Sequence, residues 1–268
     1  MFIINDSTKS DLIYPKMFGR GYDQSQVTST GLKSIFGDAP DQLKVIPRHE
    51  WSARIKEMEG TQSSLADIRK YAANGQQMPT LDQNGQGYCW AYSVTRAVMY
   101  QRAIMNQPYK RLSAHAVACM VKGFRDEGGW CGLSLEFIRR RGVPSVDVWP
   151  EKSMNRANDK PAVWENAAEN IITEGWYDAN VAVYDQQLSF DQMFTLLLLR
   201  IPVAADFNWW GHSVNLHTPR EVEPGSFCPE GDNSWTDGWG ELGSFVLQGQ
   251  KAIPDGAVAI RVINASCN

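Results

Sequence analysis

Residues 82–93 read DQNGQGYCWAYS, a glycine-rich polar stretch that runs directly into an apolar one. The glycines predict a loop over residues 82–87. From Cys89 to Met105 the apolar residues recur at helical spacing, so a buried helix is expected to begin at the cysteine. The positive end of a helix dipole favours a thiolate, which is a nucleophile at neutral pH. A buried structural cysteine is the competing interpretation, because free Cys packs as a small hydrophobe.

A thiolate nucleophile needs an imidazole partner. The chain contains four histidines, which are His49, His115, His212 and His217. His212 begins an alternating segment that is typical of a strand, and Val214 and Leu216 share its face. His217 falls on the opposite face, and His115 is expected on a helix, at the surface or half-buried. His212 is therefore the stronger candidate, although most strand histidines are only packed and hydrogen-bonded.

An asparagine that orients the imidazole would complete a site of this kind. Residues 232–240 read DNSWTDGWG, and in this segment Asn233 lies close to Trp235. By itself the segment is a polar, aromatic turn that indicates no particular chemistry.

The order of several motifs along the chain points to one protein family more specifically than any single motif does. The series is Gln83, Cys89-Trp90-Ala91, Leu112-Ser113, Gly128-Gly129-Trp130, Gly211-His212-Ser213 and Asn233-Ser234-Trp235. It resembles the papain-like cysteine peptidases over roughly residues 46–263. The histidine and the asparagine follow the cysteine at about the separation known for papain-type enzymes, roughly 130–150 residues.

The resemblance implies a role for each of four residues. Cys89 matches the nucleophile, and His212 matches the general base and acid. Asn233 matches the residue that holds the imidazole ring. Gln83 matches the side-chain amide that stabilises the tetrahedral oxyanion together with the backbone N–H of Cys89. Without the resemblance, Gln83 would be read as an exposed loop residue.

The resemblance also implies the residues that bind substrate. Gly128 and Gly129 match the stretch that hydrogen-bonds the substrate backbone. Trp235 matches the indole that shields the bond between the asparagine and the imidazole from water. Trp210 and Gly211 directly precede the catalytic histidine, so they are expected beside the substrate pocket.

The sequence departs from the family at several positions. Gln86 stands where the family commonly has a disulfide cysteine, and the usual partner of Cys119 is missing. The stretch before His212 is shorter than in the family and contains Trp209 and Trp210, which either narrow the pocket or fill the core. Substrate preference therefore does not carry over.

The hydrophobic pattern predicts an α+β fold with helices first and strands later. Helices are expected over about 51–71, 89–105, 113–122, 133–141 and 161–173, and from a capping box at Ser189 to about Arg200. Strands are expected over 203–207, 213–217, 244–247 and 257–263. The resemblance implies a papain-like domain over 46–268, with a helical half at about 46–160, an antiparallel β-barrel-like half at about 161–268, and an active-site cleft between them. Residues 1–45 are expected to be an arm that is propeptide-like or binds a partner.

Composition and charge exclude other classes of protein. The net charge of −4 argues against nucleic-acid binding through phosphate contacts. The longest strongly apolar run, Phe194–Leu199, is too short to cross a membrane. No signal peptide and no cluster with metal-ligand spacing is recognised, so neither a metal nor a cofactor is expected. The five cysteines form no C-x-x-C pair, which favours a reducing, cytoplasmic location.

Two functions are expected from this sequence. The first is a cysteine peptidase that acts on peptide or protein substrates through an acyl-enzyme. The second is a structural or binding protein on the same fold, such as a phage virion or capsid component that joins a larger assembly through its arm. Acyl transfer or amidase chemistry with the same residues is a third, weaker option. A disulfide-poor chain with an extra arm looks most like papain-like proteins of bacteria and tailed phages.

Overall fold

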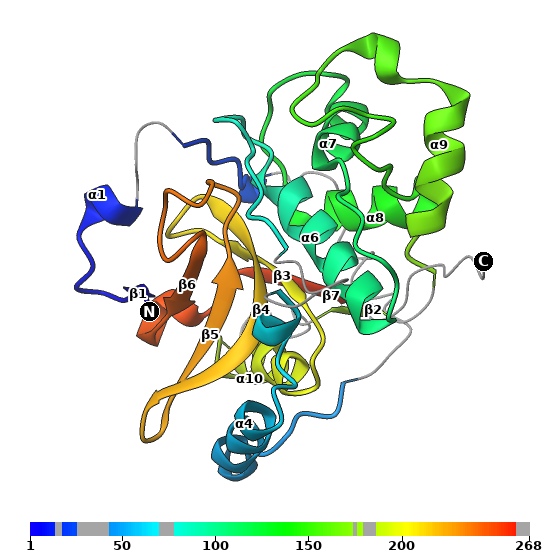
Figure 1. Cartoon of the computed structure of the whole chain (residues 1–268). Coiled ribbons are helices and arrows are strands. Elements are labelled where there is room, and N and C mark those ends of the chain that lie inside the picture. Colours follow the sequence, from blue (N-terminus) through cyan, green and yellow to red (C-terminus); the bar gives the residue numbers. More distant parts are fainter. Residues whose placement is uncertain (14–17, 26–42, 70–77, 174–175, 179–185, 261–268) are drawn as a thin grey trace.

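The computed structural model describes residues 1–13, 18–25, 43–69, 78–173, 176–178 and 186–260. A group of helices lies on one side and a twisted sheet on the other (Figure 1). The α-helices are α1 (Ser10–Ile13), α4 (Trp51–Gly60), α6 (Cys89–Ile104), α7 (Ala114–Lys122), α8 (Cys131–Arg141), α9 (Pro161–Ala167) and α10 (Gln186–Leu198). The 3-10 turns are η1 (Arg48–Glu50), η2 (Arg156–Asn158), η3 (Ala168–Asn170) and η4 (Gly249–Ala252). The strands are β1 (Ile3–Ile4), β2 (Trp176–Asp178), β3 (Val203–Phe207), β4 (His212–Glu223), β5 (Ser226–Asp232), β6 (Ser244–Leu247) and β7 (Gly256–Ile260).

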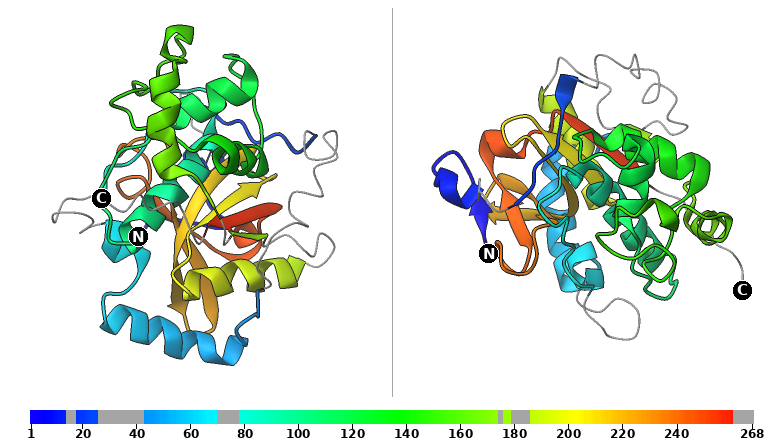
Figure 2. Two further views of the ribbon diagram at one scale, coloured as in Figure 1. Left: turned by 90° about the vertical axis from the view of Figure 1, so that its right-hand side faces the viewer. Right: turned by 90° about the horizontal axis from the view of Figure 1, so that it is seen from above.

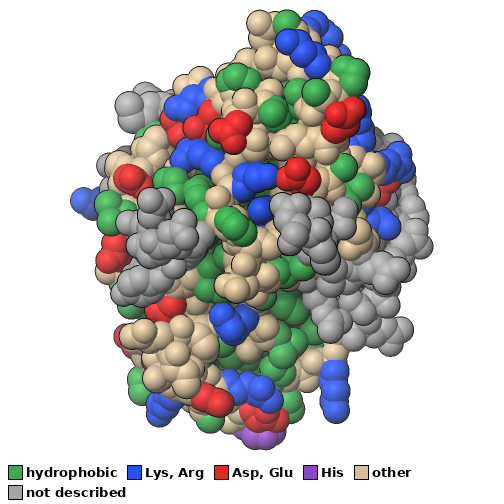
Figure 3. Space-filling model, turned by 45° about the vertical axis from the view of Figure 1, so that its right-hand side comes forward, with side chains coloured by type: hydrophobic (Ala, Val, Ile, Leu, Met, Phe, Trp, Pro, Cys, Tyr) green, Lys and Arg blue, Asp and Glu red, His purple; other side chains and the backbone are tan. Residues whose placement is uncertain are grey.

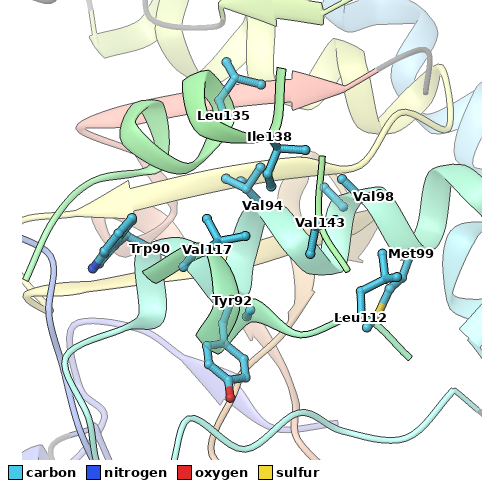
Figure 4. Close-up of a cluster of buried hydrophobic side chains, with 14 of the residues drawn as sticks. Trp90, Tyr92, Val94, Val98, Met99, Leu112, Val117, Leu135, Ile138 and Val143 are labelled. Carbon is cyan, nitrogen blue, oxygen red and sulfur yellow. The ribbon is translucent and has the colours of Figure 1, made fainter. Parts of the chain in front are cut away.

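Helix α6 lies at the centre of the molecule. Every residue from Cys89 to Arg102 is buried, as expected of a helix that is covered on all sides. One face packs against α7 and α8, and another packs against β3 and β4. In the helical core, Val94 and Val98 lie close to Ile138 and Val143 (Figure 4). This burial holds the first residue of α6 firmly against the sheet.

The strands form one seven-stranded sheet in the order β1-β6-β5-β4-β3-β7-β2. Neighbouring strands are antiparallel, except that β1 runs parallel to β6. The two edge strands, β1 and β2, do not pair with each other, so the sheet is open rather than barrel-like. Along β3, Ala204 belongs to the helical core, whereas Val203 and Ala205 belong to the core on the opposite face. That second core is covered by α10, which packs against β3 and β4, with α4 beside it (Figures 1 and 2).

Most of the expected elements are present. The predictions for α6, α7, α8, β3 and β6 agree with the structure to within a few residues. The helix α10 begins at Gln186, so Ser189 lies inside it and does not cap it. Strand β5 was not expected, because Pro229 and Gly231 interrupt the alternating pattern on which strand prediction depends.

The first residues of the chain are part of the sheet. Ile3 and Ile4 pair with Val246 and Leu247 of β6, and Ile4 is fully buried. The sequence predicted only an arm over residues 1–45, whereas the beginning of this region adds a strand to the sheet. Residues 14–17 and 26–42 of the predicted arm, and residues 261–263 of the last predicted strand, lie outside the described residues.

Surface charge is mixed on the face drawn in Figure 3, where Lys and Arg side chains alternate with Asp and Glu. Across the described residues, no helix has both the length and the apolar character that a membrane span requires.

Candidate active site

Cys89 is the first residue of α6, directly after the glycine-rich loop. In that loop, Asn84 and Gly85 adopt left-handed conformations with φ of 57° and 74°, which turn the chain sharply into the helix. The thiol is fully buried, and this burial raises its pKa to about 11. Hydrogen bonds from Ser213 and from the backbone of Gly21 partly oppose the rise in pKa. The sulfur thus lies against the beginning of β4, at Ser213, the residue that follows the predicted catalytic histidine.

His212 and Asn233 are joined by a hydrogen bond. His212 Nε2 lies 2.8 Å from Asn233 Oδ1, so the ring donates through Nε2 and leaves Nδ1 unprotonated. Within the described part of the chain, Nδ1 is buried and has no hydrogen-bond partner. Burial lowers the pKa of His212 to about 3, so the imidazole is neutral in this state. The ring of Trp235 lies 4.4 Å from the imidazole, centroid to centroid, where it covers the bond to Asn233.

Gln83 is buried, and its side-chain amide points toward a peptide carbonyl. Its Nε2 donates to the carbonyl oxygens of Gly19 at 2.9 Å and of Gln86 at 2.5 Å. Its Oε1 accepts a hydrogen bond from Ser234 Oγ at 2.6 Å. Ser234 therefore orients the amide so that its N–H groups face the cleft. The motif Asn233-Ser234-Trp235 gave no sign of this role for Ser234.

The segment Gly19–Asp23 of the arm lies between Gly129 and Gly211, and Tyr22 forms an isolated parallel β-bridge with Gly129. Gly129 N donates to the carbonyl of Gly21 at 2.7 Å, and Asp23 N donates to the carbonyl of Gly129 at 2.9 Å. On the other side, Tyr22 N donates to the carbonyl of Gly211 at 3.1 Å. The carbonyl of Gly19 also accepts from Trp235 Nε1 at 2.9 Å. The cleft thus already binds a peptide backbone, and that peptide belongs to the same chain.

The arm fits so closely that two of its residues must be glycine. A Cβ at Gly21 would lie 2.0 Å from the carbonyl oxygen of Gly87. A Cβ at Gly19 would lie 2.3 Å from the carbonyl oxygens of Gly85 and Gln86. Contacts this short are not tolerated, so any other residue would push the arm out of the cleft.

The structure brings together most of the residues that the resemblance singled out. Gly129 and Gly211 bind the arm backbone on opposite sides, and Gly128 lies beside the arm, where an added Cβ would approach Gly21 O to 2.6 Å. Trp210 is fully buried, donates its indole N–H to the carbonyl of Ile13 at 2.9 Å, and packs on Trp209. Trp210 was expected either to narrow the pocket or to fill the core, and its buried position supports the second role.

A hydrogen-bonded chain occupies the region where the family commonly has a disulfide. Gln86 Oε1 is hydrogen-bonded to His115 Nε2, and His115 Nδ1 lies 2.7 Å from the hydroxyl of Tyr92. That hydroxyl donates its proton to the carbonyl of Asp82 at 2.9 Å, so it accepts from His115 Nδ1. His115 is fully buried, contrary to the expectation from sequence. These bonds hold the loop that carries Gln83 against α6 and α7.

The chain was compared with known proteins, and no family model matches it. Zingipain-2 of Zingiber officinale is 24% identical over 214 residues, which cover 73% of this chain and 93% of that protein. The structural match to the procathepsin L2 proteinase of Tenebrio molitor larval midgut covers 98% of this chain and 84% of the procathepsin chain. Its TM-score is 0.63, and the two sequences are 16% identical. The match to xylellain, a cysteine protease from Xylella fastidiosa, covers 97% of this chain and 96% of the xylellain chain, with a TM-score of 0.54 and 16% identity.

Bromelain from Ananas comosus, solved in complex with the E64 inhibitor, covers 76% of this chain and 98% of its own, with a TM-score of 0.53 and 19% identity. These likenesses show that the chain has the papain-like fold that the order of its motifs predicts.

Proposed function

We propose that this protein is a cysteine peptidase in which Cys89, His212 and Asn233 form the catalytic set and Gln83 donates to the oxyanion. One observation carries the proposal. A peptide of the chain itself lies in the cleft, paired with Gly129, and the Gln83 amide donates to one of its carbonyl oxygens. The Zingipain-2 relative and the papain-like fold neighbours support the same activity.

The chemistry follows from this arrangement once a substrate replaces the arm. His212 Nδ1 accepts the proton of the Cys89 thiol, and the sulfur attacks the peptide carbonyl carbon. The electron pair of the C=O bond moves to oxygen, where Gln83 Nε2 and the backbone N–H of Cys89 stabilise the negative charge. His212 then protonates the leaving amine as the C–N bond breaks. Water hydrolyses the resulting thioester and regenerates the thiol.

In the arm-bound state, both reactive groups are held neutral. Burial keeps the proton on Cys89 and keeps protons off His212, so the ion pair needed for attack is not formed. We therefore propose that the arm within residues 1–45 is inhibitory, as a propeptide would be. The match to a procathepsin over 98% of this chain supports this role.

The first prediction concerns the reactivity of Cys89. Among the four cysteines that the structure describes, an epoxysuccinyl electrophile is expected to modify Cys89 and no other. Cys119, Cys131 and Cys228 are also buried, and burial raises their pKa without a catalytic histidine beside them. Intact mass and peptide mapping locate the adduct.

The control for this experiment is Cys89→Ala, which should take up no reagent and should hydrolyse no peptide. A protein that stays unlabelled even after its arm has been displaced would contradict the peptidase proposal. Equal labelling of Cys89 and Cys228 would contradict it too, because it would mean that Cys89 is not activated.

The second prediction concerns the oxyanion donor. Gln83→Ala is expected to lower kcat for peptide hydrolysis by about 10²–10³-fold, because one preorganised donor to the oxyanion is lost. Gln250→Ala, at an exposed position of η4, is the matched control and should leave kcat unchanged. Steady-state kinetics with a fluorogenic peptide measure the effect. A decrease in kcat of less than about threefold would contradict the role of Gln83 as an oxyanion donor.

A structural or binding role is the second candidate, and one observation favours it. Cys89 is fully buried and Gly21 of the arm contacts its thiol, so the described residues hold the thiol away from solvent in this state. Attachment to a phage particle or another assembly through the arm, and a cytoplasmic location, remain predictions from the sequence. The labelling experiment separates this candidate from the peptidase, because a structural protein has no reason to keep Cys89 reactive.

A further inference from the structure

The carboxamide of Asn233 orients the imidazole of His212 with its oxygen end. Its Oδ1 accepts from His212 Nε2 at 2.8 Å and from the backbone N–H of Ser234 at 2.7 Å. Because a backbone N–H only donates, the bond from Ser234 fixes which end of the amide is the oxygen. The other end, Nδ2, is buried and has no hydrogen-bond partner in the part of the chain that the structure describes. A buried donor is costly to leave unpaired, so this end of the amide needs an acceptor.

A second asparagine, Asn215 on β4, has a buried acceptor close to this donor. Asn215 lies opposite Asp232, the residue before Asn233, in the pairing of β4 with β5. Its Nδ2 donates to the carbonyl oxygens of Ser93 at 3.3 Å and Val203 at 3.4 Å. Because carbonyl oxygens only accept, the amide oxygen of Asn215 faces the other way. That Oδ1 is also buried, and no described residue donates to it, so the two asparagines present a complementary donor and acceptor.

Both asparagines line a small cavity between α6, β4 and the end of β5. Its volume is about 10 Å³, which is the room that one water molecule occupies. The other walls are largely polar and include Ser93, Arg96 and Ser213. A buried water needs about two to four polar partners, and the amide ends of Asn215 and Asn233 supply two. The cavity therefore fits a single water and excludes a larger ligand.

We propose that one water molecule binds in this cavity, accepts from Asn233 Nδ2 and donates to Asn215 Oδ1, and that Asn215 thereby acts as a positioning residue. Its effect on the reaction rate rests on the proposed peptidase function, whereas the water site rests on the cavity and the two amide ends alone. A carboxamide that is bonded at both ends holds its plane, whereas one that is bonded only at its oxygen can turn away from His212. The water thus keeps Asn233 Oδ1 directed at the imidazole.

The first test is a crystal structure of the full chain in which ordered waters are resolved, so it does not depend on catalysis. One water is expected within hydrogen-bond distance of both Asn215 Oδ1 and Asn233 Nδ2. In Asn215→Leu, which places an apolar group of similar size at the same position, this water should be absent. A wild-type structure in which the two amides bond each other directly, or in which no water lies between them, would overturn the inference.

The second test follows the Nε2 proton of His212 by NMR, and the chain has only four histidines whose ring signals must be assigned. In Asn215→Leu this signal is expected to move upfield, because the bond to Asn233 Oδ1 is weaker. Asn215→Asp should resemble the wild type, since it keeps an oxygen acceptor and Arg96 in the cavity wall offsets its charge. Both variants lose the two bonds from Asn215 Nδ2 to carbonyl oxygens, so their comparison isolates the acceptor. The same signal in both variants would rule out the positioning role.

The third test measures steady-state kinetics with a fluorogenic peptide, in chains that also carry Gly21→Ala so that the arm no longer fits the cleft. Asn215→Leu is expected to lower kcat about tenfold and to change KM by less than about twofold, because the imidazole is misaligned while the substrate still binds. Asn215→Asp should recover most of the lost kcat.

Thr95→Val is the matched control for these kinetics. Thr95 has a buried hydroxyl on α6 but does not line the cavity, so this variant should keep the kcat of its parent. Equal kcat in Asn215→Leu and Thr95→Val would overturn the positioning role. If the parent protein with the opened cleft hydrolyses no peptide, the proposed peptidase function fails, and the crystal structure and the NMR signal decide the water site on their own.

Discussion

Gly21→Ala is expected to release the arm and to speed the labelling of Cys89 by an epoxysuccinyl electrophile by tenfold or more. The added Cβ would lie 2.0 Å from the carbonyl oxygen of Gly87, and backbone atoms on both sides cannot move apart without breaking the pairing with Gly129. Forcing extra atoms into a packed site costs about 1–3 kcal/mol, and 1.4 kcal/mol corresponds to a tenfold change in an equilibrium. The open form, in which Cys89 is accessible, becomes correspondingly more populated.

Gly60→Ala is the matched control for this experiment. Gly60 lies at the end of α4, and an added Cβ there would meet no atom within 4 Å. The labelling rate of this variant should equal that of the wild type. If Gly21→Ala reacts no faster than Gly60→Ala, the arm does not limit access to Cys89, and the inhibitory role proposed for it is wrong.

The largest loss of stability is expected at Asp232, the residue before Asn233, for which a catalytic role is proposed. Its carboxylate is buried and accepts hydrogen bonds from Arg69 Nη1 at 2.6 Å, from Arg96 Nε at 2.9 Å and Nη2 at 2.8 Å, and from the hydroxyl of Tyr100 at 2.6 Å. Burial alone would raise the pKa of Asp232, but the two guanidinium groups hold it well below its usual range. Arg96 and Tyr100 belong to α6, so this carboxylate ties the nucleophile helix to the end of β5.

Asp232→Ala should therefore lower the free energy of unfolding by about 3–5 kcal/mol, because it leaves two buried guanidinium groups without a counter-charge. Unfolding in guanidinium chloride, followed by circular dichroism, measures the change. Glu50→Ala is the control, since it breaks the exposed pair with Arg54 and should change stability by less than about 1 kcal/mol. A loss of under about 1 kcal/mol for Asp232→Ala would mean that the buried network does not stabilise the fold.

The same network bears on the geometry of the active site. Asp232 is adjacent to Asn233, and the pairing of Asp232 with Asn215 sets the position of β5 against β4. Asn233 in turn orients His212 through the bond to Nε2. The stability of this region and the alignment of the imidazole therefore depend on one buried carboxylate.

Local patterns in the sequence predicted the elements whose residues obey a simple period. The helical spacing after Cys89 predicted α6, and the alternation from Val203 to Phe207 predicted β3, because each pattern reflects burial of one segment. Strand β5 and the two-residue strand β1 were missed. The residues of β5 show no clear alternation, and a strand as short as β1 forms only because β6 offers its edge.

The sequence predicted the proposed catalytic residues from an ordered series of motifs, each made of a few neighbouring residues. These local motifs could not predict how Cys89, His212 and Asn233 lie relative to one another. Their arrangement depends on α6, β4 and the end of β5, which come together only through the packing of distant segments. The contact of Gly21 with Cys89 and the orientation of Gln83 by Ser234 follow from the same packing.

The sequence by itself determined the chemical groups of the site and the helix that presents the thiol, since these depend on residue type and on local spacing. Only the tertiary structure decided the state of that site. Protonation of the thiol and of the imidazole depends first on burial and then on neighbouring groups, which include Gly21 beside Cys89 and Arg20 near His212, both from the arm.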